Sequence, residues 1–471
     1  MPVPADVLRS AVECCLDVHL NPEPSGAEER TAGVLAGLLD ADGYAVTRGV
    51  GGHGVVGVLR RGAGPTVLLR AELDALPVPE DTGLRYASTV PGVSHACGHD
   101  VHLAALAGTA RLLARDTGGW RGTVAVVGQP AEETLDGALA MLRAGLYDLT
   151  GPPDAVLAQH TAPLPAGTVA HSDGAPLLAG TVAVDAVLHG TGGHAGAPHL
   201  TVDPVVSAAA AVLRLQALVA RERAPAEQAV LTVGRLAAGT EANVIPDRAE
   251  LGISLRAFDE GTLDRLLAGV RRVLAGEAEA AGAPRAPEVA VRARSRTLLP
   301  DAALTAELRA AHVAALSPGR VLRWQPATAA EDFAWYGPAG AEVHGAPGVR
   351  LGYWMLGTVS AAARREAART GRPVPGNHSP RFAPDLRAAV VTGIEALTAA
   401  ARRALGAREP DDDGAGGAGR PGGAGGERAG ADGPDADRAG ARRPDADRPD
   451  ADRAGAERVG ADGVAGGGAG R

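Results

Sequence analysis

Apolar positions near the start of the chain recur every three or four residues, which is the spacing of one face of an amphipathic helix. This pattern predicts helices over residues 6–20 and 28–41. Ser25 and Glu28 are spaced like a capping box at the start of the second helix, and Gly43 follows its end. We expect both helices to cover a sheet.

Further along the chain, short runs rich in β-branched residues alternate with helical patterns. These runs predict, in order, strand 66–70, helix 100–114, strand 123–127, helix 138–143 and strand 155–158. Such alternation is typical of a mainly parallel sheet with helices on both faces. The predicted fold class is therefore α/β.

Between about residues 181 and 283 the order changes to strand, long helix, two strands and helix, which indicates an inserted α+β domain. Strand and helix patterns then return and end near residue 407. Gly, Ala, Asp, Arg and Pro dominate the remainder, a composition that predicts disorder because it offers little apolar surface to bury. The predicted boundaries are 1–180 and 289–407 for the main domain, 181–288 for the insertion and 408–471 for the tail.

The composition excludes several classes of protein. The chain has 471 residues and a formal net charge of -9, and no basic stretch is interleaved with aromatic residues, so we expect no nucleic-acid partner. All 46 basic residues are Arg. Mechanisms that need a lysine amine, such as the P-loop or a pyridoxal Schiff base, therefore have no lysine to use.

The start of the chain lacks the charged segment and continuous apolar run of a secretory signal. No later run reads as long and apolar enough to span a bilayer, so we expect no membrane partner. Cys14, Cys15 and Cys97 do not form a disulfide pattern, because two are adjacent and the third has a different setting. These features predict a cytoplasmic protein.

Polar side chains follow three of the predicted strands. Glu72 and Asp74 come after the first, Glu132 and Glu133 after the second, and His160 after the third. In parallel sheets, ligands bind outside the carboxyl ends of the strands. The three strand ends therefore direct acidic groups or an imidazole towards one rim, where we expect the functional site.

Cys97 and His99 are two residues apart, directly before a predicted helix whose N-terminus lowers the pKa of a thiol. A thiolate at this position would suit metal binding. The alternative is a small buried Cys97 and a helix-capping His99, which is the better explanation of an isolated pair. The neighbouring donors favour the metal site.

Glu132 and Glu133 are adjacent carboxylates at a strand end, and such neighbours suit separate tasks, one binding metal and the other moving protons. On their own they would be explained as a solvated acidic loop, and single histidines such as His160 and His378 are usually structural. Together with Cys97, these residues supply the mixed Cys, His and Glu donors that zinc-like divalent metals accept.

At this point the sequence resembles a known family, the M20 amidohydrolases. The nearest branch holds hippurate hydrolases, N-acyl amino acid deacylases and auxin-conjugate hydrolases, and the likeness spans roughly residues 7–405. The segments that carry it are 70–77, 95–100, 129–133, 192–195, 243–246 and 331–333. Two departures are Glu72, where many relatives have Asp, and the triplet 158–160, which reads Ala-Gln-His rather than Gly-Leu-His.

The resemblance implies a hydrolase that cleaves the amide bond of small N-acyl amino acids with two divalent ions (Zn, Mn, Co or Ni). It implies Glu132 as the general base and five metal ligands, namely Cys97, His99, Glu133, His160 and His378. It also implies that the insertion mediates a homodimer and that His194, Asn243 and Arg256 contact the substrate. His194 would reach the active site of the partner subunit to stabilise the oxyanion.

Two other functions stay open. A dipeptidase or aminopeptidase on the same scaffold would need an acidic anchor for a free α-amine. A non-catalytic binding protein is disfavoured, because it would have no use for a proton-handling Glu132 beside a ligand. The glycine pattern at 49–54 fits the dinucleotide fingerprint, but a strand rather than a helix follows it, which indicates a β-hairpin turn. The chain lacks the G-x-S-x-G motif of common serine hydrolases.

Overall fold

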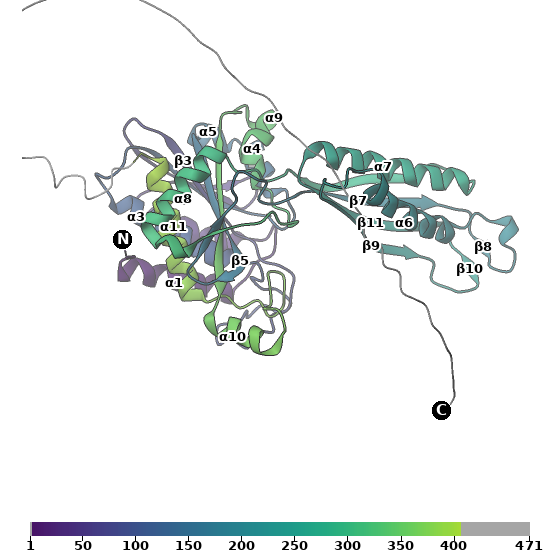
Figure 1. Ribbon diagram of the computed structural model, residues 1–471, viewed down its shortest axis with the longest axis horizontal. Helices are drawn as coiled ribbons and strands as arrows, with labels where there is room; N and C mark the ends of the chain where they lie inside the picture. The colour runs from purple at the N-terminus through teal and green to yellow at the C-terminus, as the bar shows by residue number, and fades with distance from the viewer. Residues whose placement is uncertain (1, 407–471) are drawn as a thin grey trace, which may run out of the picture. The chain divides into compact units, whose positions relative to one another are not determined.

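The computed structural model describes residues 2–406, so the predicted tail at 408–471 lies outside the described residues. Its larger sheet, in which Figure 1 labels β3 and β5, has the strand order β1-β2-β4-β3-β5-β14-β6-β13. The strands are β1 Ala45–Val50, β2 Gly54–Arg61, β3 Thr66–Glu72, β4 Gly122–Gln129, β5 Ala155–Pro165, β6 Val169–His171, β13 Val321–Arg323 and β14 Arg350–Val359. The central strands β4, β3, β5 and β14 run parallel, which confirms the predicted α/β class.

Helices cover both faces of this sheet. The first face is covered by α1 Ala5–Leu20, α2 Glu29–Ala41, α3 His99–Arg115, α8 Ala302–Leu316 and α11 Leu386–Ala404. The second is covered by α4 Gly137–Arg143, α5 Leu146–Thr150, α9 Ala341–His344 and the 3-10 helix η3 Phe333–Tyr336. The remaining short helices are α10 Ala361–Thr370, η1 Pro198–Leu200, η2 Pro318–Arg320 and η4 Pro338–Gly340.

The central strands are apolar on both sides because they contribute to two cores. In β3, Val67 and Leu69 pack under the first group of helices, and Leu68 packs under the second. This alternation follows from the two-residue period of a strand. A strand buried on both faces reads as a continuous apolar run, which is why its position could be predicted.

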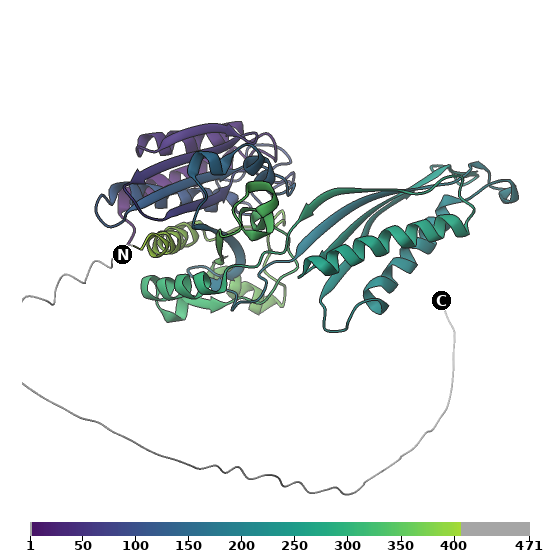
Figure 2. The same cartoon turned by 90° about the horizontal axis from the view of Figure 1, so that it is seen from above.

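A second sheet lies between β6 and β13 in the chain. Its strands have the order β12-β7-β11-β9, with β7 Gly180–His189, β9 Ala229–Ala238, β11 Arg248–Ala257 and β12 Glu288–Ser295. Two helices, α6 Pro204–Arg221 and α7 Glu260–Ala280, pack on one face and form a core with it (Figure 2). The short strands β8 Gly193–His194 and β10 Val244–Ile245 pair with each other.

Two local predictions differ from the structure. The sheet extends past the expected boundary at residue 288, because β12 pairs with β7. The predicted capping box is wrong, since α2 has no side-chain cap at its N-terminus. Ser25 Oγ instead donates to Asp74 Oδ2 at 2.7 Å, and Glu28 Oε1 accepts from the amide of Ala131 at 2.8 Å. Both side chains bond to distant segments, and neither caps the helix.

The glycine-rich segment at 49–54 connects β1 to β2 in an antiparallel pair, as predicted, and opens no helix. The sequence analysis expected no run long and apolar enough to span a bilayer. This expectation needs correction, because α6 meets that criterion by length and composition. This helix is apolar on two sides. Ala211 and Leu215 pack into the core of the second sheet, whereas Val206 and Leu213 are 64% and 76% exposed.

Candidate active site

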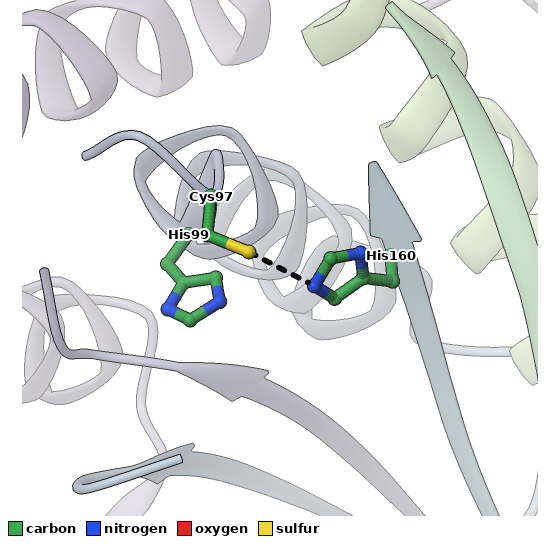
Figure 3. Close-up of side chains that lie close together, drawn as sticks. All are labelled: Cys97, His99 and His160. Carbon is green, nitrogen blue, oxygen red and sulfur yellow. Dashed lines mark hydrogen bonds between the residues drawn. The ribbon is translucent and has the colours of Figure 1, made fainter. Parts of the chain in front are cut away.

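Cys97 and His99 flank Gly98 at the start of α3, and both side chains are buried. Gly98 has a φ of 81°, and a Cβ there would lie 2.8 Å from Thr161 Cγ2, so both conformation and space favour glycine. Cys97 Sγ lies 3.4 Å from His160 Nε2, and Figure 3 shows these side chains pointing towards each other, with His99 beside them. Burial opposes ionisation, but His160 and His99 hold the pKa of the Cys97 thiol well below its usual range.

His99 is oriented by the segment that follows β3. Its Nδ1 lies 2.8 Å from the carbonyl oxygen of Asp74 and 3.3 Å from Asp74 Oδ1. Asp74 Oδ2 in turn accepts hydrogen bonds from Ser25 Oγ and from the amide of Glu133. Because Nδ1 must donate to a carbonyl, the neutral imidazole of His99 has Nε2 as its acceptor, 3.7 Å from Glu132 Oε2.

His160 lies inside β5, not after it, which corrects the strand predicted at 155–158. The strand is longer because β14 pairs with it, placing Met355 opposite His160. His160 Nδ1 lies 2.9 Å from the carbonyl oxygen of Thr161, so Nε2 is free to face Cys97. The position of this imidazole therefore depends on sheet pairing.

Glu133 and His378 lie far apart in the sequence. His378 Nε2 lies 3.4 Å from Glu133 Oε2, and the His378 amide donates to the carbonyl of Ala96 at 2.8 Å. The backbone of His378 is left-handed, with a φ of 67°. A non-glycine residue rarely adopts this conformation, and such strain is concentrated at functional sites.

The predicted ligands form overlapping groups whose donor atoms lie within 4.8 Å of one another. These groups include Cys97-His99-His160, Cys97-Glu133-His378 and His99-Glu132-Glu133. Among the described residues, His99 Nε2 and Glu133 Oε1 are buried without a hydrogen-bond partner. Unpartnered buried acceptors beside a thiol and imidazoles fit divalent metal ions, and Cys97 is common to two of the groups.

Glu132 is suited to a different task. Its side chain is buried, and burial, reinforced by the carboxylates of Glu331 and Glu133, raises its pKa well above the usual range. A carboxylate with a raised pKa is a stronger base than one in water. Glu132 therefore has the environment expected of a group that accepts and returns a proton.

A cavity of about 450 Å³ opens onto these residues. Of the predicted site residues, it is lined by Cys97, Glu132, Glu133, His160, His378 and Arg256. Arg256 lies on β11, and its Nη1 donates to the carbonyl of Thr328 at 2.6 Å. His194 and Asn243 are not among the lining residues. They lie close together, where the Ala195 amide donates to the Asn243 carbonyl at 3.0 Å.

Comparison with known proteins identifies the family. The sequence profile of Peptidase family M20/M25/M40 matches residues 68–363. The chain belongs to this family. The match covers the candidate ligands up to β14 and confirms the resemblance seen in the sequence.

Individual M20 relatives agree with this assignment. The chain is 36% identical over 324 residues to an N-acetyl-L-cysteine deacetylase of Bacillus subtilis, covering 68% of this chain and 75% of the relative. It is 40% identical over 242 residues to an IAA-amino acid hydrolase of Arabidopsis thaliana, covering 51% of this chain and 54% of the relative. A solved Bacillus subtilis structure described as a dinuclear metal-binding M20 peptidase matches with a TM-score of 0.65 at 27% identity, covering 84% and 99% of the two chains.

In this M20 chain, a buried charge network that the sequence analysis did not assign supports the site. Arg70 is fully buried and donates to Glu331 Oε1 at 2.9 Å and to Asp332 Oδ1 at 3.0 Å. It also contacts Glu72. The sequence did carry a signal for this network, since Arg70 and Glu72 are charged residues in an otherwise apolar strand. Buried charges need partners, so such residues indicate a charge network.

Thr161 and Asn377 are further residues that sequence reasoning missed. Thr161 Oγ1 donates to the Cys97 carbonyl at 2.6 Å, and Asn377 Nδ2 donates to Thr161 Oγ1 at 2.9 Å. These bonds connect the segments that carry Cys97, His160 and His378. Neither Thr161 nor Asn377 belongs to a recognisable sequence motif. Only the position of Asn377 next to His378 could have suggested that Asn377 supports the site.

Proposed function

We propose that this protein is a metal-dependent amidohydrolase that cleaves the amide bond of N-acyl amino acids or similarly small carboxylate-bearing amides. The observation that carries this proposal is the convergence of four candidate ligands and Glu132 on one cavity that is also lined by Arg256, with His99 in the same donor groups. The deacetylase and amino acid hydrolase relatives support the same reaction type.

Two divalent ions would be held by Cys97, His99, Glu133, His160 and His378. Cys97 is common to two of the donor groups, so its thiolate would contribute to holding the ions at this site. Bound ions of this kind supply Lewis acidity, which lowers the pKa of water and polarises a carbonyl. Asp74 contributes by holding His99 in the tautomer that exposes Nε2.

Glu132 accepts the proton of the attacking water and returns it to the leaving amine, so one carboxylate acts first as base and then as acid. Its burial favours this exchange, because proton uptake removes a charge from a poorly solvated position. The products are a carboxylic acid and an amino acid.

Arg256 provides the anchor for the substrate carboxylate. One guanidinium nitrogen is engaged with the Thr328 carbonyl, and the remaining N–H groups are available for a charge-assisted pair. A peptidase would instead need a carboxylate for a free amine. Besides Glu132 and Glu133, the lining carboxylate is Glu331, which already accepts from Arg70 and Tyr353.

His194 and Asn243 would complete the site of a second copy of the chain. The exposed apolar side of α6, with Val206 and Leu213, adjoins a sheet whose edge strand β9 has one unpaired side. Exposed apolar patches and open strand edges favour association. A homodimer through this second sheet would cover both features, and we propose that it brings His194 to the partner's cavity.

Metal depletion and reconstitution test the proposed function. Chelator-treated protein is assayed with N-acetyl and N-benzoyl amino acids and with the dipeptide Ala-Gly, before and after addition of Zn²⁺, Mn²⁺, Co²⁺ or Ni²⁺. We expect turnover of the N-acyl amino acids only after a metal is restored, with little turnover of Ala-Gly. Full activity in verified metal-free protein, or a clear preference for Ala-Gly, would contradict the proposal.

A further inference from the structure

Backbone strain is concentrated around the candidate active site. Among the described residues, the non-glycine positions with positive φ are Ala131, Leu135, Ser317 and His378. Three of these four flank the catalytic glutamates or serve as a predicted ligand. Leu135, with a φ of 64°, is the largest apolar side chain among them. A left-handed backbone disfavours every side chain and favours glycine, so the leucine calls for an explanation.

Core packing does not supply that explanation. Leu135 is half-buried and belongs to none of the apolar cores of the described residues, whereas Leu139, one helical turn later, packs against the core on the second face of the main sheet. The Leu135 amide donates to the Glu132 carbonyl at 2.8 Å. This bond closes a turn that fixes Leu135 relative to the proposed general base.

Leu135 lines the active-site cavity together with Leu178, Trp324 and Met355. Met355 is the strand partner of His160, so part of this apolar lining adjoins the candidate ligands. The guanidinium in the lining is Arg256. A cavity with one cationic anchor and a largely apolar lining matches a molecule with a carboxylate at one end and an apolar group at the other.

We propose that Leu135 is a specificity-determining residue that contacts the acyl group of the substrate and favours apolar acyl groups larger than acetyl. This inference rests on the proposed amidohydrolase function. The strained backbone is retained because it directs an apolar side chain into the cavity directly beside Glu132. A glycine at this position would relieve the strain and remove the contact.

The experiment compares N-acetyl-, N-butanoyl-, N-hexanoyl- and N-benzoylglycine in metal-loaded wild-type protein, Leu135→Gly and Leu135→Ala. We expect wild type to have a higher kcat/KM for the hexanoyl and benzoyl substrates than for the acetyl substrate. In both variants the hexanoyl-to-acetyl ratio should fall about tenfold or more, the range associated with loss of a methylene-sized contact. Leu135→Gly should keep or raise the wild-type Tm, because glycine accepts the left-handed backbone, whereas Leu135→Ala retains the strain.

Several results would overturn the inference. One is a wild-type preference for acetylglycine, and another is a ratio that stays within twofold in both folded variants. A parallel series of N-acetylglycine, N-acetylleucine and N-acetylphenylalanine locates the contact. If Leu135→Gly changed the kcat/KM ratios only in that series, the side chain would contact the amino acid part of the substrate instead of the acyl group. Absence of hydrolysis of every N-acyl amino acid with every metal would refute the proposed function itself, and the inference with it.

Discussion

His102 Nδ1 lies 2.7 Å from Glu72 Oε2, and both side chains are buried. The other ring nitrogen, Nε2, accepts a hydrogen bond from the Thr161 amide at 2.8 Å. Nε2 is therefore unprotonated, and the proton on Nδ1 is donated to Glu72. Although His102 follows His99 on the same helical face, neither nitrogen retains a lone pair for a metal. His102 is a structural link between β3 and the segment that carries His160.

We predict that His102→Ala lowers the free energy of unfolding by about 2–6 kcal/mol. The substitution leaves Glu72 Oε2 and the Thr161 amide buried without partners, and each such loss costs about 1–3 kcal/mol. Urea unfolding measures the difference. His199→Ala, at an exposed histidine, is the control and should change stability by no more than about 0.5 kcal/mol. A similar small change for His102→Ala would show that the link is dispensable.

Cys97→Ser should lower the metal content of the purified protein. A serine hydroxyl keeps the size of the thiol but is a much poorer anionic ligand, and Cys97 belongs to two of the donor groups. Metal analysis after dialysis measures the occupancy. Cys14→Ser provides the matched control, since that buried cysteine is absent from the donor groups given above. Equal metal content in both variants would mean that Cys97 is only a packing residue.

Glu133→Gln should weaken metal binding, whereas Glu132→Gln should leave it intact. In Glu132→Gln, the amide keeps the shape of the side chain and loses proton transfer, so kcat should fall by about a hundredfold or more while metal stays bound. Glu133→Gln should lose metal, because its Oε1 is a buried unpartnered acceptor beside His99. Steady-state kinetics and metal analysis together decide the assignment. Metal loss confined to Glu132→Gln would exchange the two roles.

The predictable features of the fold are those coded by neighbouring residues. The apolar run of β3 and the alternation of strands and helices indicated an α/β protein, since a strand buried on both faces reads as a continuous apolar segment. β12 was not predicted, because its side chains are mostly exposed and it is recognisable as a strand through its pairing with β7. The extension of β5 past His160 similarly depends on β14.

The same distinction applies to the candidate site, where some residues are recognisable from their neighbours in the sequence and others only from distant partners. Cys97, His99, Glu132 and Glu133 stand in short strings with distinctive donor spacing, so they could be proposed from the sequence. Arg70 could not be connected to Glu331, because 261 positions separate these residues in the chain. Ser25 was interpreted as a helix cap, whereas it supports Asp74, since a local motif and a distant partner compete for the same hydroxyl.

The stability of the protein should depend on pH through His19. Burial opposes protonation of this imidazole, but the carboxylate of Asp100, followed by that of Glu80, outweighs it and raises the pKa of His19 to about 9. Because the folded pKa lies above the unfolded value of about 6.5, the contribution of His19 is fully present below pH 6.5 and disappears as the pH rises through 9. The shift corresponds to about 3 kcal/mol.

Urea unfolding of wild type and His19→Gln at several pH values between 6 and 10 tests this dependence. The difference in stability between the two proteins should be greatest at pH 6, should shrink as the pH rises from about 6.5 to 9, and should be small above pH 9. Glutamine retains hydrogen-bonding capacity but cannot gain charge, so it isolates the ionic contribution. A constant difference across this range would show that the His19 proton does not stabilise the fold.

His194 is exposed on β8 and lies outside the lining of the cavity of its own chain, so we expect any catalytic task of this residue to be carried out in a second copy. If His194 of one subunit donates to the developing oxyanion in the other, it acts mainly in the transition state. His194→Ala should then lower kcat by roughly a hundredfold, with little change in KM or metal content. A proportional rise in KM with an unchanged kcat would instead indicate a substrate-binding role.

Subunit mixing separates action between subunits from action within one. A heterodimer of one Glu132→Gln subunit and one His194→Ala subunit contains one site with both defects and one site with neither, because the intact Glu132 and the intact His194 belong to different chains. Two nearly inactive parents should therefore give a heterodimer with about half of wild-type activity. An equal mixture should reach about a quarter, since about half of the dimers in it are mixed. If the activity of the mixture stays at the parental level after exchange is verified by mass-labelled subunits, His194 either acts within its own chain or has no catalytic role.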